Sequence, residues 1–198
     1  KYREEKRMEV KRIVTMDVNN FELGDQITVK LYGYGKFTAT AHEITDKGTL
    51  FIFDDCVCER QMNKENTNEG GYLETDLRKF VTQELLKAFP GELLVKMVKD
   101  DNGDLLSIPT YGQILGKNWN DEWDQKNIEI DQREQLPLME IKKNRIANLN
   151  GEWEWCWFWL QNKVRSSSGF VGVGGSCDVA GDFDASESIG VRPAFLIK

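Results

Sequence analysis

The chain has 198 residues, of which 40% are hydrophobic and 30% charged, a balance typical of a globular protein rather than a disordered one. Its formal net charge is −7 at pH 7, and it has no basic stripe that would bind a nucleic-acid backbone. No apolar run approaches the roughly 20 residues that span a bilayer, so we expect neither a nucleic-acid partner nor a membrane span. Four cysteines are too few to staple a domain of this size, and we expect reduced, structural thiols.

Residues 1–20 are predicted to form a charged N-terminal arm. The first twelve contain six Lys or Arg against three Glu and few apolar residues. The chain begins with Lys1 rather than Met, which favours a fragment or a processed product. No signal peptide is visible, and the start of the chain leaves localisation open.

Three strands and a helix are predicted in the first half of the remaining chain. Residues 27–32 alternate apolar and polar side chains, and the runs 37–44 and 50–53 follow glycine-bearing turns, which predicts a small antiparallel meander. Apolar residues then recur on one helical face between residues 73 and 88, and Thr75 can cap this helix. A Pro-Gly pair ends it.

The second half is predicted to contain short strands and two further helices. Residues 116–135, which lie between these two helices, are predicted to form a polar, acidic excursion loop. No internal repeat and no linker is visible, so residues 21–198 are expected to form a single α+β domain. We expect a mixed, mostly antiparallel sheet, two main helices and long loops. The predicted strands are 93–98, 105–108, 155–161, 170–173 and 191–197, and the predicted helices are 109–115 and 138–149.

Four of the six tryptophans lie at alternate positions between Trp153 and Trp159, on one face of a predicted strand. The other face carries Cys156, Phe158 and Leu160. Because both faces are apolar, the pattern predicts a central strand covered on each side. Trp153, beside two glutamates at the strand edge, is expected to be the most exposed of the four. An aromatic platform that stacks on sugars or bases is the alternative.

Arg192 lies between apolar residues and just before a proline. A buried guanidinium needs acceptors for its five donors. We expect a structural clamp, with a ligand contact as the alternative. Its partners are expected to be backbone carbonyls or one of the carboxylates of Asp182, Asp184 and Glu187.

The closing residues carry a family resemblance. Trp157-Phe-Trp-Leu-Gln161, a Ser/Gly-rich run and Gly190-Val-Arg-Pro-Ala-Phe195 resemble an uncharacterised domain family of bacteria and their phages. Its members carry an aromatic Trp-Trp-Leu-Arg-type strand and end in Gly-Val-Arg-Pro-Ala-Phe. Segments at 24–27, 74–80 and 106–110 are similar to earlier parts of that family, so the resemblance covers residues 21–197. The chain departs from it at Gln161, where Arg is usual.

More remotely, Ser186-Glu-Ser-Ile-Gly-Val-Arg192 is similar to the last strand of C-type-lectin-like folds, especially the formylglycine-generating-enzyme branch. The resemblance implies a C-type-lectin-like fold and a place in a larger surface or phage-related protein. It does not fix a function, because one fold supports many.

No catalytic constellation is visible in the sequence. His42 is the only histidine, so a Ser/His/Asp arrangement or a His-bearing zinc site would depend on it, and a satisfied core or surface role is more usual there. Residues 172–176 lack the Gly-Lys-Ser/Thr ending of a phosphate loop. Oxidase chemistry of the formylglycine-generating type needs two nearby cysteines, and an open cleft joining Cys156 and Cys177 would support it. We expect no cofactor.

The excursion loop is the best binding candidate. Two tryptophans in a polar loop are costly to leave in water, so they form either a lid on the core or a contact surface. Residues 119–121 also coincide with a short calcium-site motif of C-type lectins. The candidate ligand-binding residues are therefore Trp119, Asn120, Asp121 and Trp123.

A metal site is left open by the sequence. Asp178, Asp182 and Asp184 can offer hard oxygen ligands to Ca²⁺, but their spacing lacks the glycine and the terminal glutamate of an EF-hand. We expect a non-catalytic module that binds or displays a protein or carbohydrate ligand. The alternatives are an enzyme of formylglycine-generating-like ancestry and a structural subunit that assembles through residues 1–12.

Overall fold

Two five-stranded sheets form the framework of the described chain. The computed structural model describes residues 21–119, 121–151, 155–175 and 180–198, and the predicted arm, residues 1–20, lies outside these ranges. Within them the class is α+β, and the strand pairing is mostly antiparallel, as the sequence predicts. The C-type-lectin-like architecture stays a prediction.

The first sheet begins with the predicted meander. Its strand order is β1-β2-β3-β12-β5, and every neighbouring pair is antiparallel. The register of β2 against β3 shifts between Ala41 and Glu43, so His42 occupies a β-bulge. The bounds are Gln26–Leu31 (β1), Gly35–Thr45 (β2), Gly48–Phe53 (β3), Ala194–Ile197 (β12) and Met97–Val98 (β5).

The second sheet has the order β10-β9-β8-β11-β4, with β8 and β11 parallel and the other pairs antiparallel. A separate two-stranded ladder joins β6 to β7. β8, which contains Trp159 at the end of the tryptophan block, is central, as predicted. The bounds are Cys58–Gln61 (β4), Ala147–Asn148 (β6), Trp155–Cys156 (β7), Phe158–Lys163 (β8), Phe170–Val173 (β9), Ala180–Phe183 (β10) and Ser188–Val191 (β11).

One main helix spans residues 76–88, where the sequence places it. It starts as α1 (Asp76–Lys79), widens to a π turn (Phe80–Glu84) and tightens to a 3-10 turn (Leu85–Ala88). Thr75 caps it by accepting from the Arg78 amide at 3.1 Å. Shorter helices are η1 (Tyr72–Glu74), α2 (Gly91–Leu94), α3 (Tyr111–Leu115), α4 (Glu122–Asn127), η4 (Pro137–Glu140) and η5 (Lys142–Arg145). No helix in the described ranges has the length and apolarity to cross a membrane.

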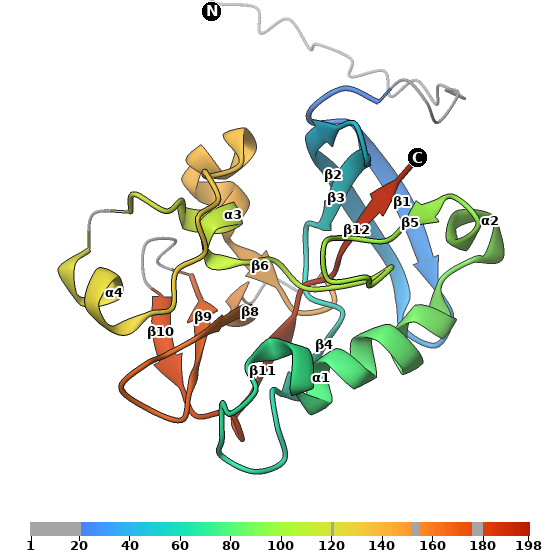
Figure 1. Ribbon diagram of the computed structural model, residues 1–198. Helices are drawn as coiled ribbons and strands as arrows, with labels where there is room; N and C mark the ends of the chain where they lie inside the picture. Colours follow the sequence, from blue (N-terminus) through green and yellow to red (C-terminus); the bar gives the residue numbers. More distant parts are fainter. Residues whose placement is uncertain (1–20, 120, 152–154, 176–179) are drawn as a thin grey trace, which may run out of the picture.

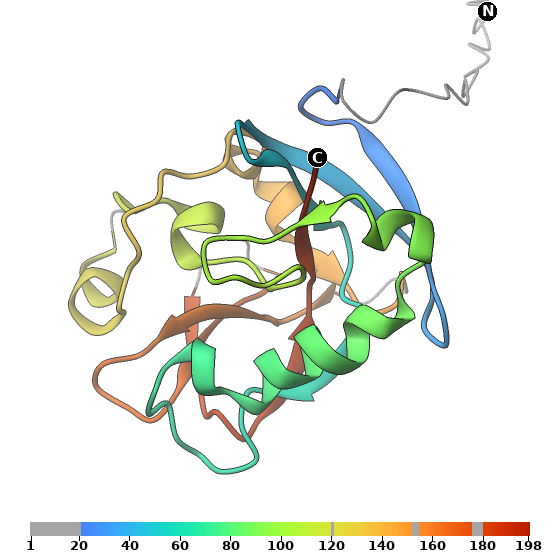
Figure 2. The ribbon, with the colours of Figure 1, turned by 45° about the vertical axis from the view of Figure 1, so that its right-hand side comes forward.

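Each face of the paired sheets has its own core. The main helix covers one face, where Leu77, Val81 and Leu85 pack with residues of both sheets (Figures 1 and 2). The opposite face packs against α3 and the chain between residues 128 and 139. The helix and the α3 region therefore enclose the sheets from two sides.

Two predicted strands and one predicted helix are wrong. Residues 93–98 form α2 and only a two-residue β5, because the amides of Leu93 and Leu94 donate to the Pro90 carbonyl at 2.9 and 3.0 Å and continue a helical turn. The segment 105–108 makes a single bridge, between Ser107 and Ala194.

The predicted helix 138–149 is two short 3-10 turns followed by β6. Side chains take the carbonyls that a continuing helix would use: Asn144 Nδ2 donates to the Leu138 carbonyl at 2.7 Å, and Gln135 Nε2 donates to that of Met139 at 3.0 Å. The described residues therefore hold one main helix rather than two. The excursion 116–135 also contains a short helix, α4.

The predicted closing strand 191–197 is two strands in different sheets. The chain leaves the second sheet after β11, breaks at Arg192-Pro193 and enters the first sheet as β12, a crossing visible in red in Figure 1. Pro193 lacks an amide hydrogen and cannot continue a ladder. This crossing ties the two sheets together.

Burial on two faces is confirmed for residues 158–160, but the predicted strand 155–161 is interrupted at Trp157, and Trp155 belongs to β7 in the separate ladder. Trp159 is fully buried in the core under the main helix, and its Nε1 donates to the Arg60 carbonyl at 2.7 Å. Phe158 and Leu160 lie in the opposite core. Trp155, by contrast, is 56% exposed, and Trp153 lies outside the described residues.

Arg192 is the structural clamp that the sequence predicts, held by carbonyls. Its Nε donates to the Phe53 carbonyl at 2.7 Å, and its Nη2 donates to that of Asn144 at 3.0 Å. The guanidinium also lies 5.0 Å from the centre of the Phe158 ring. The proposed carboxylates of Asp182, Asp184 and Glu187 do not hold it.

Candidate functional site

The two tryptophans of the predicted site differ in exposure: Trp119 packs against the core, whereas Trp123 faces the solvent. Trp119 is partly buried against the second core, with the Arg145 guanidinium 5.3 Å from its ring centre. Trp123 is 44% exposed on α4. Asp121 caps α4 by accepting from the amides of Trp123 and Asp124 at 2.9 and 3.1 Å. Asn120 lies outside the described residues, and the ligand role of this loop stays a prediction.

The candidate calcium residues are only partly described. Asp178 lies outside the described ranges, and Asp182 accepts a hydrogen bond from the Ser167 hydroxyl at 2.9 Å. Across the described ranges, no three His, Cys, Asp or Glu side chains come close enough together to hold a metal ion. The calcium hypothesis therefore gains no support from these residues.

A polar hollow lies between the α3-side face of the first sheet, the turn at residues 100–102, the start of α3 and residues 131–133. Its volume is about 540 Å³, within the range typical of small-molecule sites. We call it the polar hollow. It is lined by Glu43, Thr45, Asp46, Lys47, Leu50, Asp100, Asp101, Asn102, Ser107, Thr110, Gln113, Asp131, Arg133, Gln161, Ala194 and Leu196.

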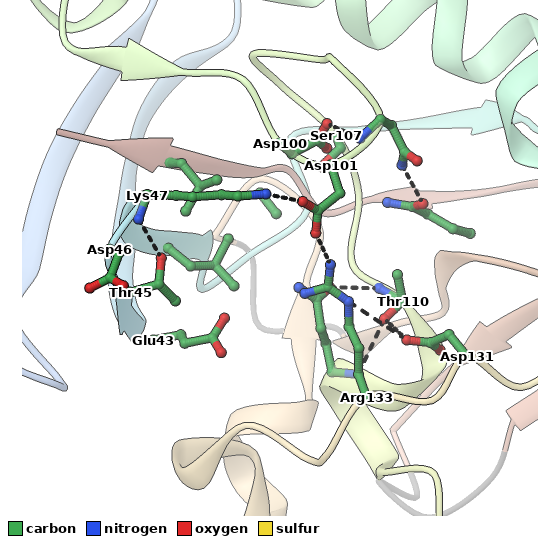
Figure 3. Close-up of a pocket in the computed structure, with 16 residues that line it drawn as sticks. Glu43, Thr45, Asp46, Lys47, Asp100, Asp101, Ser107, Thr110, Asp131 and Arg133 are labelled. Atoms are coloured by element: carbon green, nitrogen blue, oxygen red, sulfur yellow. Dashed lines mark hydrogen bonds and ion pairs between the residues drawn. The ribbon is translucent and has the colours of Figure 1, made fainter.

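A line of alternating charges crosses the polar hollow. Lys47 Nζ contacts one carboxylate oxygen of Asp101, and Arg133 Nη2 contacts the other at 2.9 Å (Figure 3). The Lys47 ammonium lowers the pKa of the Asp101 carboxyl by hydrogen bonding and by its charge. These side chains are largely solvent-accessible, so each ion pair contributes little stability, and a ligand can compete for it at small cost.

Asp131 forms the rigid floor beside this line. Its carboxylate accepts from the Thr110 hydroxyl at 2.8 Å, the Gly112 amide at 2.7 Å and Asn162 Nδ2 at 3.1 Å. Thr110 also makes a capping box with Gln113 at the start of α3. The carboxylate thus fixes three separate segments relative to one another and holds Arg133, two residues on, at the mouth of the hollow.

A second hollow adjoins the first and is more apolar. Its volume is also about 540 Å³, and it shares Glu43, Gln113 and Arg133 with the polar hollow. We call it the His42 hollow. It is lined by Leu23, His42, Glu43, Ile44, Gln113, Arg133, Glu134, Gln135, Leu136 and Pro137.

His42 is buried in the wall of this second hollow with an unused ring nitrogen. The side chain is 2% exposed, and its Nδ1 makes no hydrogen bond with the described part of the chain. Burial, and then the charge of Arg192, lower the pKa of His42 to about 3, so the ring is neutral near pH 7. The sequence suggested a satisfied histidine, and the bulge that turns this residue inward leaves no signal in the alternating pattern.

Glu43 lines both hollows, and its carboxylate has no partner within the described ranges. Its side chain is half-buried and makes no ion pair or hydrogen bond within the described ranges. It lies across the polar hollow from Arg133, and no dashed line reaches it in Figure 3. Nothing in the sequence distinguishes Glu43 from other surface glutamates, because its position depends on the same bulge.

Two thiols meet near the junction of the sheets. The Cys56 thiol donates a hydrogen bond to Cys156, which lowers the pKa of Cys156, while burial raises the pKa of Cys56. A Cβ at Gly190 would lie 2.6 Å from one sulfur and 3.1 Å from the other. Cys177 lies outside the described residues, so the proposed approach of Cys156 to Cys177 stays untested.

Among the described residues, hydroxyl groups pair with carboxylates, as Thr110 does with Asp131, but no nucleophile is paired with His42. The ring of His42 has no Ser, Cys or Asp hydrogen-bonded to it in these ranges. Together the polar hollow and the His42 hollow form one preformed cleft, which is lined by charged side chains and a neutral imidazole. No family model, no curated protein and no solved structure matches the chain.

Proposed function

We propose that the protein is a non-catalytic ligand-binding module whose ligand occupies the polar hollow and the adjoining His42 hollow. The observation that carries this proposal is the line of exposed ion pairs from Lys47 through Asp101 to Arg133, which crosses a cavity of ligand size. Arg133 Nε also lies 4.0 Å from Asp131 Oδ2, at the limit of an ion pair. Solvent-accessible charged side chains that are weakly paired in a cavity can exchange these partners for a ligand at small cost.

The frame around these charges is preorganised for binding. Asp131 joins residues 110–112, 131–133 and 162 through three hydrogen bonds, so the ligand would not have to order these segments. Preorganisation raises affinity because less conformational freedom is lost on binding. The mixed charge of the wall favours a polar ligand, either a free small molecule or the end of a larger chain.

The family resemblance supports a display role. A module of this kind, attached to a larger surface or phage-related protein, would present the cleft to a protein or carbohydrate partner. The remaining alternatives are an enzyme of formylglycine-generating-like ancestry and a subunit that assembles through residues 1–12. Among the described residues His42 has no paired nucleophile, and the Thr110 hydroxyl that donates to Asp131 also caps α3; both observations favour binding over catalysis.

A variant-resolved binding screen tests the proposal. Amino acids, amines, monosaccharides, nucleosides and organic acids are screened against the full chain by ligand-observed NMR. Each binder is then titrated into Arg133→Ala, Trp123→Ala and the exposed control Lys87→Ala. We expect Arg133→Ala to weaken binding at least about ten-fold and the other two to leave it unchanged.

Two results would overturn this assignment of the site. Binding that is lost in Trp123→Ala and kept in Arg133→Ala would move the site to the excursion loop. A screen without a single binder in any of the five classes would contradict a small-ligand module altogether.

A further inference from the structure

We propose that the His42 hollow selects hydrophobic cations, molecules in which an ammonium group adjoins an apolar group, with the ammonium bound by Glu43. This inference rests on the proposed function and adds the chemical class of the ligand. It is built from the charge that is left uncommitted, the apolar wall and the unused nitrogen of His42.

The uncommitted charge in this hollow is negative. Arg133 is paired with Asp101 at 2.9 Å, and Glu134 is paired with Lys117 at 2.6 Å. Glu43 alone among the charged residues of this wall has no partner within the described ranges. A half-buried carboxylate is poorly solvated, so it gains more from an ammonium partner than an exposed carboxylate does.

The rest of the wall is suited to an apolar group. The lining includes the buried Leu136 and its neighbour Pro137, together with the exposed apolar side chains of Leu23 and Ile44. Ile44 is 53% exposed, although Ala41 and His42, a little earlier in β2, are buried. A ligand that covers Ile44 and Leu23 would remove their surface from water, at about 25 cal/mol for each Å².

His42 supplies the independent observation that points to a ligand. A buried polar nitrogen without a hydrogen bond is rare, and it lowers stability unless something satisfies it. His42 lines the hollow, but its Nδ1 is shielded from solvent, so an occupant can satisfy it only after a small movement of the ring or the wall. Because the ring is neutral near pH 7, it does not repel a cation at Glu43 next to it.

A side chain of the protein itself could compete with a ligand for Glu43. Arg133 faces both hollows, and a rotation of its side chain could bring it from Asp101 to Glu43. Glu43 would then be neutralised by the protein itself, and the hollow would have no preference for a cation. The experiment must therefore separate charge selectivity from simple filling of an apolar hollow.

Three probes of matched shape make this separation. The ¹⁵N-labelled full chain is titrated at pH 7 with 2-phenylethylammonium, with 2-phenylethanol and with phenylacetate, and amide shifts are followed by NMR. We expect the ammonium probe to shift the amides of residues 42–44 and 134–136. We also expect it to bind about ten-fold more tightly than the alcohol, and phenylacetate to bind more weakly still.

Three variants assign the effect. Glu43→Gln, which keeps the shape of the side chain, should reduce the affinity for the ammonium probe to that for the alcohol. Ile44→Ser should weaken both probes, because it removes exposed apolar surface and leaves the core intact. Glu92→Gln, on α2 and outside both hollows, should change neither.

The outcomes separate the ligand class from the proposed function. Equal binding of the ammonium and the alcohol in this hollow, unchanged in Glu43→Gln, would overturn the cation class and leave a binding cleft. Probe-induced shifts confined to the neighbourhood of Trp123, or no shifts at millimolar probe, would overturn both. If Glu43→Gln lowers the thermal midpoint, the ligand class is still decided by two other measurements. These are the effect of Ile44→Ser and the ratio of the affinities of the unmodified chain for the ammonium and alcohol probes.

Discussion

Replacing Asp131 with alanine should both destabilise the fold and loosen the cleft. The Asp131 carboxylate accepts three hydrogen bonds, from the Thr110 hydroxyl, the Gly112 amide and Asn162 Nδ2, at 2.8, 2.7 and 3.1 Å. The side chain is 26% exposed, so water can replace part of what is lost. Hydrogen bonds to a charged group contribute about 1.5–3 kcal/mol each before such replacement.

We expect a loss of about 3 kcal/mol in the free energy of unfolding for Asp131→Ala, less than the simple sum because the three donors share one solvent-accessible site. For a chain of this length, that loss corresponds to a fall in Tm of roughly 6–12 °C. Asp131→Asn should cost about 1 kcal/mol, because its Oδ1 still accepts two of the bonds and the Thr110 hydroxyl can turn to accept from the new amide.

Urea and thermal unfolding of the three chains measure these differences, with Asp46→Ala as the matched control for removing an exposed carboxylate from the same wall. If the losses for Asp131→Ala and Asp46→Ala lie within about 0.5 kcal/mol of each other, Asp131 does not fix the floor of the polar hollow, and this carboxylate does not preorganise it for a ligand.

Three further predictions concern the core and the titrating groups. Trp159→Ala should lower stability by about 3–5 kcal/mol in urea unfolding while Trp155→Ala changes it by less than about 1 kcal/mol, and similar losses would contradict the two-faced core. Cys156, half-buried with a lowered pKa, should be alkylated by iodoacetamide before Cys56, whose pKa is raised, as peptide mass spectrometry can show; the reverse order would refute the thiol hydrogen bond. Because the pKa of His42 falls from 6.5 to about 3 on folding, the unfolded chain binds the extra proton, and stability should drop as pH falls below about 6.5, at up to about 1.4 kcal/mol per pH unit. Urea unfolding at several pH values should show this slope and its reduction in His42→Gln, and an equal slope in both chains would contradict the buried neutral ring.

Much of the fold follows from local patterns in the sequence. The meander of β1 to β3 and the helix after Thr75 are where periodicity and capping place them. The alternation of residues 157–160 also predicts that β8 is buried on both faces. These features depend on the spacing of side chains along one element, which a single sequence contains.

The wrong predictions arise where the secondary structure is determined by residues far apart in the sequence or by side-chain hydrogen bonds to the backbone. Residues 138–149 have helical spacing, but Asn144 and Gln135 take the backbone carbonyls, and the helix becomes two 3-10 turns. The closing run 191–197 looks like one strand, yet Pro193 divides it between two sheets. Whether a side chain or a backbone amide bonds a given carbonyl, and which sheet a strand joins, depends on contacts that form only when the chain folds.

The cleft could not be predicted, because none of its parts is a motif. Glu43 and His42 owe their positions to a bulge in β2, and Asp101 and Arg133 are far apart in the sequence. Before folding, each reads as an ordinary surface charge or an isolated histidine. The loop around Trp123 drew attention in the sequence because tryptophan is conspicuous there, whereas a cleft of common polar residues is visible only once the segments are assembled.

The most direct test of the binding-module account is a crystal structure of the full chain with the tightest binder from the five-class screen. The account predicts that the ligand lies between Glu43 and Arg133, within hydrogen-bonding distance of at least one of these side chains, with the Asp131 hydrogen bonds intact. A ligand bound at Trp123, with both hollows filled only by water, would contradict it.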